Sequence, residues 1–157
     1  ADAEIVCRGR NGERRVPAAE FFTLPTVDPA RETVLKDGEL LAEIVLPARS
    51  ASLRSTYHKI LDREAWTHAV VSAAVALEID KEVVRSARVV LGGVAPIPWR
   101  LPEVEKMLTG QRLTTELAAR AGETAVAGAR PLAKNGYKVP LTRNMVKRTL
   151  EGFVRTV

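Results

Sequence analysis

Residues 70–79 decide the fold of this chain, and they read Val-Val-Ser-Ala-Ala-Val-Ala-Leu-Glu-Ile. From residue 71 onward every odd-numbered position is apolar, whereas Ser72, Ala74 and Ala76 at the even positions are small. Successive side chains of a β-strand point to opposite faces of its sheet. The period of two therefore predicts a strand with one face in a hydrophobic core and another face that a second layer can approach closely.

The segments around residues 70–79 predict further strands of the same sheet. Arg54–Ile60 precedes them, and Ser86–Leu91 follows after the short turn Asp80-Lys81-Glu82, which predicts an antiparallel hairpin. Leu40–Leu46 predicts a fourth strand in this sheet.

Beyond residue 100 the apolar period changes from two to 3.6, which predicts helices. Pro102 suits the first position of a helix over Pro102–Leu108. Thr115 is the predicted cap of a second helix, Glu116–Ala129, and a third opens at Pro140 or Leu141. Strands followed by helices predict an α+β fold, with a small antiparallel sheet of three to four strands packed against C-terminal helices.

The N-terminal region predicts a separate hairpin, because Asn11-Gly12 is a strong turn signal between two short alternating segments. Residues 1–22 are too few to form a domain. Pro25 and Pro29 interrupt the next stretch, so residues 23–30 are predicted to be a linker. The predicted main domain covers residues 31–157.

Composition excludes several classes of protein. The 157 residues are 46% hydrophobic and 27% charged, as expected for about one globular domain rather than a disordered chain. The longest strongly apolar stretch, residues 69–77, is too short to span a bilayer. The single cysteine, Cys7, can form neither an internal disulfide nor an iron–sulfur cluster, and the lack of a disulfide framework favours the cytoplasm.

Few residues point to chemistry when they are considered alone. His58 and His68 are ten residues apart, which does not fit a metal pair, and we expect no metal site and no catalytic residue in this chain. Gly92-Gly93 is interpreted as a strand end where two backbones pass closely rather than as a phosphate-binding loop. The net charge of +5 leaves open a nucleic-acid or acidic-protein partner. Scarce aromatic residues argue against specific nucleic-acid binding.

Four stretches in order, and nearly the whole chain around them, resemble the FAD-binding (medium) subunit of the molybdenum hydroxylases. This family includes xanthine dehydrogenase, carbon monoxide dehydrogenase and aldehyde oxidoreductase. The stretches are Phe21-Phe22 before Leu24-Pro25, Lys36-Asp37-Gly38-Glu39-Leu40-Leu41 before Ile44-Val45-Leu46-Pro47, Tyr57-His58-Lys59-Ile60-Leu61-Asp62-Arg63-Glu64-Ala65, and Leu91-Gly92-Gly93-Val94-Ala95-Pro96-Ile97-Pro98-Trp99-Arg100.

The resemblance implies that residues 31–157 are the C-terminal domain of such a subunit, with the fold of the carbon monoxide dehydrogenase flavoprotein C-terminal domain. Residues 1–22 would be the end of an FAD-binding domain that is incomplete here. The glycine-rich loops that hold the FAD pyrophosphate would lie before Ala1.

Two residues are implied to contact FAD. Leu41 matches an apolar residue that packs near the flavin ring, and Lys59 matches a lysine that approaches it. The loop Ile60–His68 matches a segment beside the flavin. It contains Asp62-Arg63-Glu64 where some relatives have two arginines, so the resemblance implies nothing about NAD as electron acceptor.

The implied function is electron transfer by an FAD-binding subunit, with this part covering the isoalloxazine end of FAD. The implied partners are the N-terminal FAD-binding portion of the same subunit, a large subunit with the molybdenum cofactor and a small subunit with iron–sulfur clusters. The chain alone is expected to be inactive. The alternative is a non-catalytic basic module that docks an acidic protein or nucleic acid.

Overall fold

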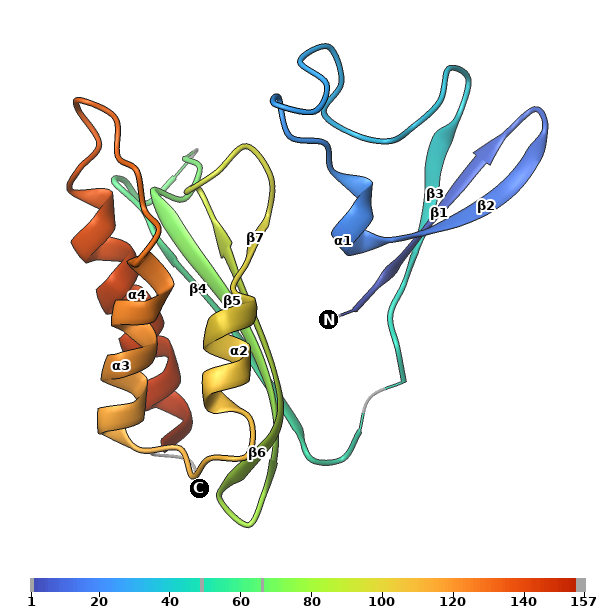
Figure 1. The fold of residues 1–157 in the computed structure, drawn as a ribbon. Helices are drawn as coiled ribbons and strands as arrows, with labels where there is room; N and C mark the ends of the chain where they lie inside the picture. Colours follow the sequence, from blue (N-terminus) through green and yellow to red (C-terminus); the bar gives the residue numbers. More distant parts are fainter. Residues whose placement is uncertain (1, 49, 66, 155–157) are drawn as a thin grey trace. The chain divides into compact units, whose positions relative to one another are not determined.

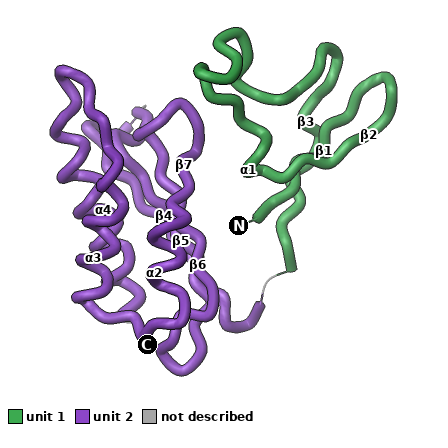
Figure 2. Tube along the Cα trace, viewed as in Figure 1, with its two compact units in different colours: residues 1–49 green, residues 50–157 purple. Residues whose placement is uncertain are grey.

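The chain folds into two compact units, residues 1–49 and residues 50–157 (Figure 2). The computed structural model describes residues 2–48, 50–65 and 67–154. The boundary at residues 49 and 50 lies about twenty residues after the predicted linker at 23–30, because the intervening chain packs with the N-terminal hairpin.

The first unit is a three-stranded antiparallel sheet in the order β2-β1-β3, with one turn of helix, α1, against it (Figure 1). Its elements are β1 (Glu4–Gly9), β2 (Gly12–Pro17), α1 (Ala18–Phe21) and β3 (Leu40–Val45). The predicted hairpin is therefore present. Its small core consists of Ile5, Cys7, Val16 and Phe21.

The prediction that Leu40–Leu46 belongs to the main sheet is wrong. The strand β3 pairs with β1 in the first unit, where Ile44 lies opposite Ile5 and Leu41 lies opposite Cys7. Hydrophobic patterning indicates that a segment is a strand but does not say which strand it will pair with.

The second unit contains the predicted α+β domain. Its antiparallel sheet has the strand order β4-β5-β6-β7, so that β4 and β7 are the two edges. The strands are β4 (Leu53–Ile60), β5 (Val71–Asp80), β6 (Val83–Gly92) and β7 (Trp99–Arg100).

Three helices follow the sheet: α2 (Pro102–Leu108), α3 (Thr115–Val126) and α4 (Lys138–Val154). The helix α2 packs on β6, α4 packs on β5, and α3 packs on the other two helices (Figure 1). The cap of α3 is Thr114 rather than the predicted Thr115, because its hydroxyl accepts the Leu117 N–H at 3.2 Å. Among the described residues, no helix has the length and apolar character needed to cross a membrane.

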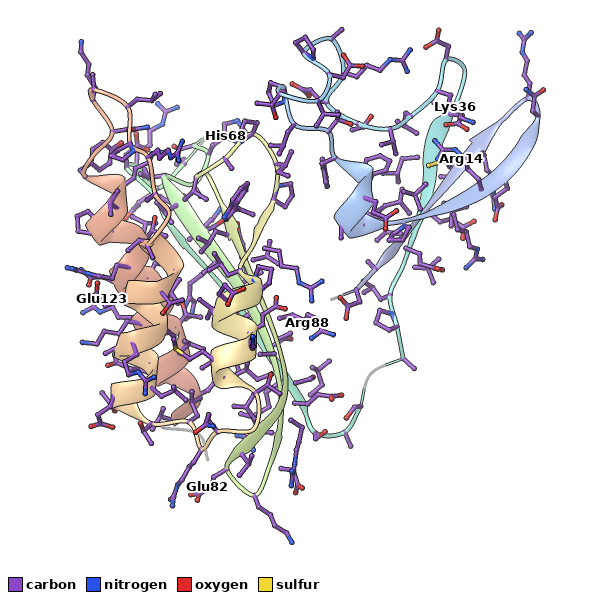
Figure 3. All side chains as sticks on the ribbon, viewed as in Figure 1. Arg14, Lys36, His68, Glu82, Arg88 and Glu123 are labelled. Atoms are coloured by element: carbon purple, nitrogen blue, oxygen red, sulfur yellow. The ribbon has the colours of Figure 1, made fainter. Side chains whose placement is uncertain are left out.

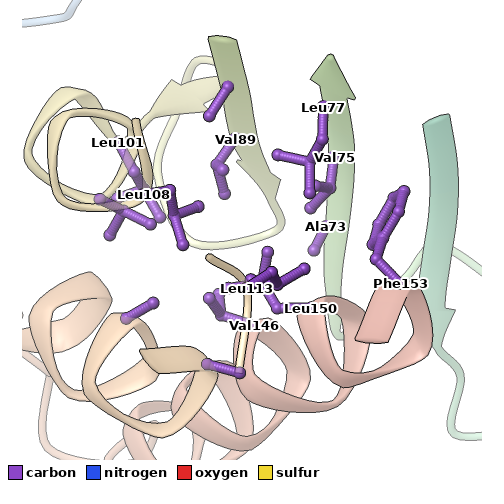
Figure 4. Packing of buried hydrophobic residues seen from close by; sticks show 14 of the residues in the cluster. Ala73, Val75, Leu77, Val89, Leu101, Leu108, Leu113, Val146, Leu150 and Phe153 are labelled. Atoms are coloured by element: carbon purple, nitrogen blue, oxygen red, sulfur yellow. The ribbon is translucent and has the colours of Figure 1, made fainter. Parts of the chain in front are cut away.

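The core of the second unit lies between the helices and one face of the sheet (Figure 4). The odd positions of β5 are at its centre, and Val71, Ala73, Val75 and Leu77 are almost fully buried. Helix residues such as Val146, Leu150 and Phe153 pack against them. The even position Ala74 is exposed on the opposite face, which no described helix of this unit covers.

A partly buried ion pair holds the start of β3 in the first unit. The Arg14 guanidinium donates to both Glu39 carboxylate oxygens at 2.9 and 2.8 Å, and Glu39 also accepts the Lys36 N–H at 2.8 Å. Figure 3 shows Arg14 next to the turn that contains Lys36. The hydrogen bonds from Arg14, and then that from the Lys36 backbone, lower the pKa of Glu39 from 4.5 to about 2.

The β5–β6 hairpin has a two-residue turn formed by residues that disfavour its conformation. Lys81 and Glu82 have φ values of +47° and +68°, as in a type I′ turn, for which Asn-Gly is preferred. The turn lies at the end of the unit where Figure 3 labels Glu82. The Glu82 carboxylate pairs with Arg112 at 2.7 Å, but both side chains are largely exposed, so the pair contributes little.

Replacing this turn by Asn-Gly should stabilise the protein. We expect the variant Lys81→Asn/Glu82→Gly to gain about 1 kcal/mol of unfolding free energy, because Asn and Gly adopt positive φ at lower cost. Lys81→Val should lose stability by a similar amount, because a β-branched side chain is disfavoured there. Urea unfolding measures both changes, and a less stable Asn-Gly variant would contradict this account.

The Arg14–Glu39 pair should make stability depend on pH in the acid range. Because the folded pKa is depressed, the stabilisation is fully present above pH 4.5 and is lost as the pH falls through about 2. Glu39→Gln should therefore lower the calorimetric unfolding temperature at pH 7 and have little effect near pH 2. The control Glu32→Gln changes an exposed carboxylate of the same unit, and its unfolding temperature should stay close to that of the parent at both pH values. An effect of Glu39→Gln that is constant over this range would rule out the pair as its cause.

Candidate functional site

The candidate residue Lys59 lies near the end of the edge strand β4, on the face of the sheet away from the helices. It pairs across the ladder with Ser72, and cross-strand neighbours share a face. Its side chain is exposed, and within the described residues its ammonium has neither a hydrogen-bond acceptor nor an acidic partner. Lys59 is thus a positive charge available to a bound group.

The surface around Lys59 consists largely of small and flat side chains. The ladder places two β5 alanines between the edge strand β4 and the inner strand β6. We call this surface the helix-free face, and its members are Tyr57, Lys59, Ala74, Ala76, Arg88 and Val90. Because the alanines are small, a planar group can approach the backbone of β5 closely between the flanking side chains.

The chain after Lys59 forms a loop whose described residues are held by local hydrogen bonds. The Val70 N–H donates to the Ile60 carbonyl at 2.8 Å and closes the loop. The Thr67 hydroxyl donates to the Asp62 carboxylate at 2.7 Å. The loop is therefore fixed at its base, where it leaves β4 beside Lys59.

The Gly92-Gly93 pair supports the same loop. Gly93 has φ +74°, and a Cβ there would lie 2.8 Å from the Val70 carbonyl oxygen and 3.0 Å from that of Ala69. The Gly93 carbonyl in turn accepts the Lys138 ammonium at 2.8 Å. The groups at Gly93 are carbonyl oxygens, which repel a phosphate, so the interpretation as a close approach of two backbones is confirmed.

The candidate residue Leu41 lies on β3 in the first unit, whereas Lys59 belongs to the second. Leu41 is 42% exposed, although it lies opposite the buried Cys7. Two other apolar residues of β3, Leu40 and Ile44, are still more exposed. The edge strand β3 therefore presents apolar side chains beside the core of the first unit. A bound apolar group can pack against them.

The histidines and the cysteine do not form a metal site in the structure. The Nδ1 atom of His58 lies 3.3 Å from the Thr149 hydroxyl, in a pocket between β4 and α4. His68 lies in the loop after β4, and Cys7 is buried in the other unit. In the described ranges, no three His, Cys, Asp or Glu side chains come together in a way that could hold a metal ion.

Sequence reasoning missed the role of Arg100 and Glu105. The Glu105 carboxylate is nearly buried and receives Arg100 Nε at 2.9 and 3.1 Å and Arg100 Nη2 at 2.9 Å. It also accepts the Val89 N–H at 3.0 Å, which joins α2 to β6 and β7. The arginine that ends the Gly-Gly-Val-Ala-Pro stretch is therefore structural. The sequence feature that could have revealed this ion pair is the spacing of five residues between Arg100 and Glu105.

Comparison with known proteins identifies the second unit. The family model described as the CO dehydrogenase flavoprotein C-terminal domain matches residues 56–153 of this chain.

Two curated relatives extend the match into the first unit. The aldehyde oxidoreductase FAD-binding subunit PaoB of Escherichia coli is 34% identical over 137 residues, which are 87% of this chain and 38% of that protein. The carbon monoxide dehydrogenase medium chain of Hydrogenophaga pseudoflava is 31% identical over 153 residues, 95% of this chain and 51% of that protein. The chain thus spans about half, or less, of the length of these relatives.

Solved structures agree with the fold. Carbon monoxide dehydrogenase from Hydrogenophaga pseudoflava matches with a TM-score of 0.82 and 32% identity, over 94% of this chain and 50% of that one. Reconstituted CO dehydrogenase from Oligotropha carboxidovorans matches with a TM-score of 0.81 and 26% identity, over 94% and 51%.

The family match covers more than half of the chain and runs from within β4 to near the end of α4. The chain therefore belongs to the CO dehydrogenase flavoprotein C-terminal domain family.

Proposed function

We propose that this chain is the C-terminal part of the FAD-binding electron-transfer subunit of a molybdenum-dependent hydroxylase or dehydrogenase. In this role it covers the isoalloxazine end of FAD. The observation that carries the proposal is the family match over residues 56–153; within it, Lys59 is an exposed cation on the face of the sheet away from the helices. The relatives named above, an FAD-binding subunit and a medium chain, support it.

The helix-free face fits the isoalloxazine ring but not the rest of FAD. Its two alanines leave room for a planar ring, and Lys59 supplies a charge that has no partner among the residues the structure describes. FAD needs backbone N–H donors at its pyrophosphate, whereas the groups around Gly93 are carbonyls. The chain is therefore suited to cover a flavin that is anchored by another part of the subunit.

Lys59 is proposed to tune the flavin. Bound FAD would supply the acceptance and release of electrons. A cation near the ring favours added negative charge by Coulomb attraction and so raises the reduction potential. The base of the loop after β4, where the Val70 N–H donates to the Ile60 carbonyl, keeps the end of β4 in place.

Leu41 is proposed to supply an apolar contact to the flavin ring from the first unit. Its partial exposure beside Cys7 supports this role, because an apolar side chain gains free energy when a bound ring covers it. We further propose that residues 1–22 complete an FAD-binding domain and that residues 31–157 form the C-terminal domain of the subunit.

The proposed partners supply the remaining chemistry. They are the N-terminal FAD-binding portion of the subunit, a large subunit with the molybdenum cofactor and a small subunit with iron–sulfur clusters. The names of the relatives and the single cysteine of this chain support this division. The chain alone is proposed to be inactive and the location cytoplasmic, since one cysteine gives no internal disulfide.

The isolated chain should bind FAD weakly. A charge-assisted hydrogen bond contributes about 1.5–3 kcal/mol, whereas micromolar affinity requires about 8 kcal/mol. Titration followed by flavin fluorescence should therefore give a dissociation constant well above the micromolar range. A constant near or below one micromolar would contradict the covering role and indicate a complete site in this chain.

Removing the charge of Lys59 should change the reduction potential of the flavin more than the amount of FAD that the subunit retains. In the full-length subunit we expect Lys59→Met to lower the flavin midpoint potential by roughly 20–45 mV, because one nearby charge is worth about 1–2 kcal/mol. The FAD content should stay near that of the parent. The control Lys106→Met removes an exposed lysine from α2 and should leave the potential unchanged. Loss of FAD at an unchanged potential would instead make Lys59 an anchoring residue.

A further inference from the structure

We propose that the second unit carries a binding site for a small aromatic anion, in a cavity formed by β7, the start of α2, the end of α3 and the start of α4. This site does not depend on the proposed flavin role. Three observations carry it: an open apolar cavity, a hydroxyl of a nearly buried residue that faces this cavity without a described hydrogen-bond partner, and a local excess of positive charge.

The cavity has a volume of about 450 Å³, within the usual range of about 300–1,000 Å³ for small-molecule sites. Most of its lining is apolar. Trp99, Pro102 and Pro131 contribute flat surfaces, and Trp99 is still 43% exposed. A planar apolar ligand can stack on these surfaces, and its burial would remove the tryptophan ring from water.

The Thr142 side chain lines this cavity from α4. The residue is only 4% exposed, and its hydroxyl makes no hydrogen bond to any residue that the structure describes. Among the described residues, every side-chain oxygen that is shielded from solvent has a hydrogen-bond partner. Because the Thr142 hydroxyl has no such partner, it faces the open space of the cavity. A buried hydroxyl of this kind favours a ligand with one hydrogen-bonding atom at the base of the site.

The charge around the cavity favours an anion. Arg130 and Lys138 line it against one acidic residue, Glu103. Residues 124–150 contain six basic and no acidic residues. Lys138 lies one helical turn before Thr142 and donates to the Gly93 carbonyl at 2.8 Å, which leaves other ammonium hydrogens for a ligand. Among the described residues the Arg130 guanidinium has no partner.

Together these features select an aromatic ring system with a carboxylate or sulfonate group. The ring occupies the apolar cavity, a polar atom of the ligand reaches Thr142, and the acid group lies near Arg130 and Lys138. Such a site binds by a combination of apolar burial and charge, without a metal and without covalent chemistry.

The probe for the test is 1-anilinonaphthalene-8-sulfonate, added to the chain with the change Trp66→Phe, which leaves Trp99 as the single tryptophan. We expect saturable binding of one probe per chain, with energy transfer from Trp99 to the probe. Loss of binding in the cavity-filling variant below locates the probe, since β3 also exposes apolar side chains. The uncharged 1-anilinonaphthalene should bind more weakly, and only the sulfonate should lose affinity as salt is raised.

Three variants test the individual contacts, each checked by its unfolding temperature. Thr142→Val keeps the shape of the side chain and should weaken binding about three- to tenfold. Arg130→Gln should weaken it about threefold at low salt only. Ala129→Phe changes an exposed lining residue to one that fills the cavity without adding a tryptophan, and it should abolish energy transfer. The matched control Lys134→Gln removes a charge from the same loop outside the lining and should leave affinity within about twofold.

Several results would overturn the proposal. These are no saturable binding by the folded chain, energy transfer that survives Ala129→Phe, or equal effects of Arg130→Gln and Lys134→Gln. A competition experiment compares free phenylacetate with an acidic peptide that contains one phenylalanine. If the peptide displaces the probe more strongly, the cavity is assigned to a protein partner instead. Retained binding in Thr142→Val, at full affinity, would remove Thr142 from the site and overturn its assignment as the hydrogen-bonding group.

Discussion

The alternation of side chains along β5 is the constraint on which the second unit depends. Its odd positions are large enough to fill a core, and its even positions are small. Shifting the ladder by one residue would turn Val75 and Leu77 away from the helices and lose about 1.5–3 kcal/mol for each exposed side chain. The register is therefore fixed, and with it the face on which Lys59 lies.

The ends of the strands are held by polar contacts rather than by the core. Glu105 joins α2 to β6 and β7 through Arg100 and the Val89 N–H. These bonds fix the point at which the chain returns to the sheet after Gly93. The Gly93 backbone in turn contacts the end of the loop that follows Lys59. Removing Arg100 would leave the nearly buried Glu105 carboxylate without its cation, at a cost below the roughly 3–5 kcal/mol of a fully buried pair, because the Arg100 side chain is 38% exposed. The motif that ends at Arg100 thus acts on the candidate site indirectly.

Sequence reasoning predicted the elements well where local patterns determine them. The bounds of the helix Pro102–Leu108 and the position of the β5–β6 hairpin follow from a proline and from alternation, which are local signals. The partner of Leu40–Val45 could not be predicted, because it depends on contacts with β1, more than thirty residues earlier. Glu105 was missed because a glutamate in the first turn of a helix has the appearance of a surface residue. The assignments of Leu41 and Lys59 to a flavin came from a family resemblance, and both remain proposals.

The position of β4 at the edge of its sheet has a consequence for solubility. An edge strand exposes unpaired N–H and C=O groups, which can pair with the edge of another molecule and start aggregation. Lys59 lies near one end of this strand and Arg54 near the other, and two copies in an antiparallel edge-to-edge arrangement would bring these like charges together. The positive charge that is proposed to act on a cofactor thus also opposes self-association while the edge is uncovered.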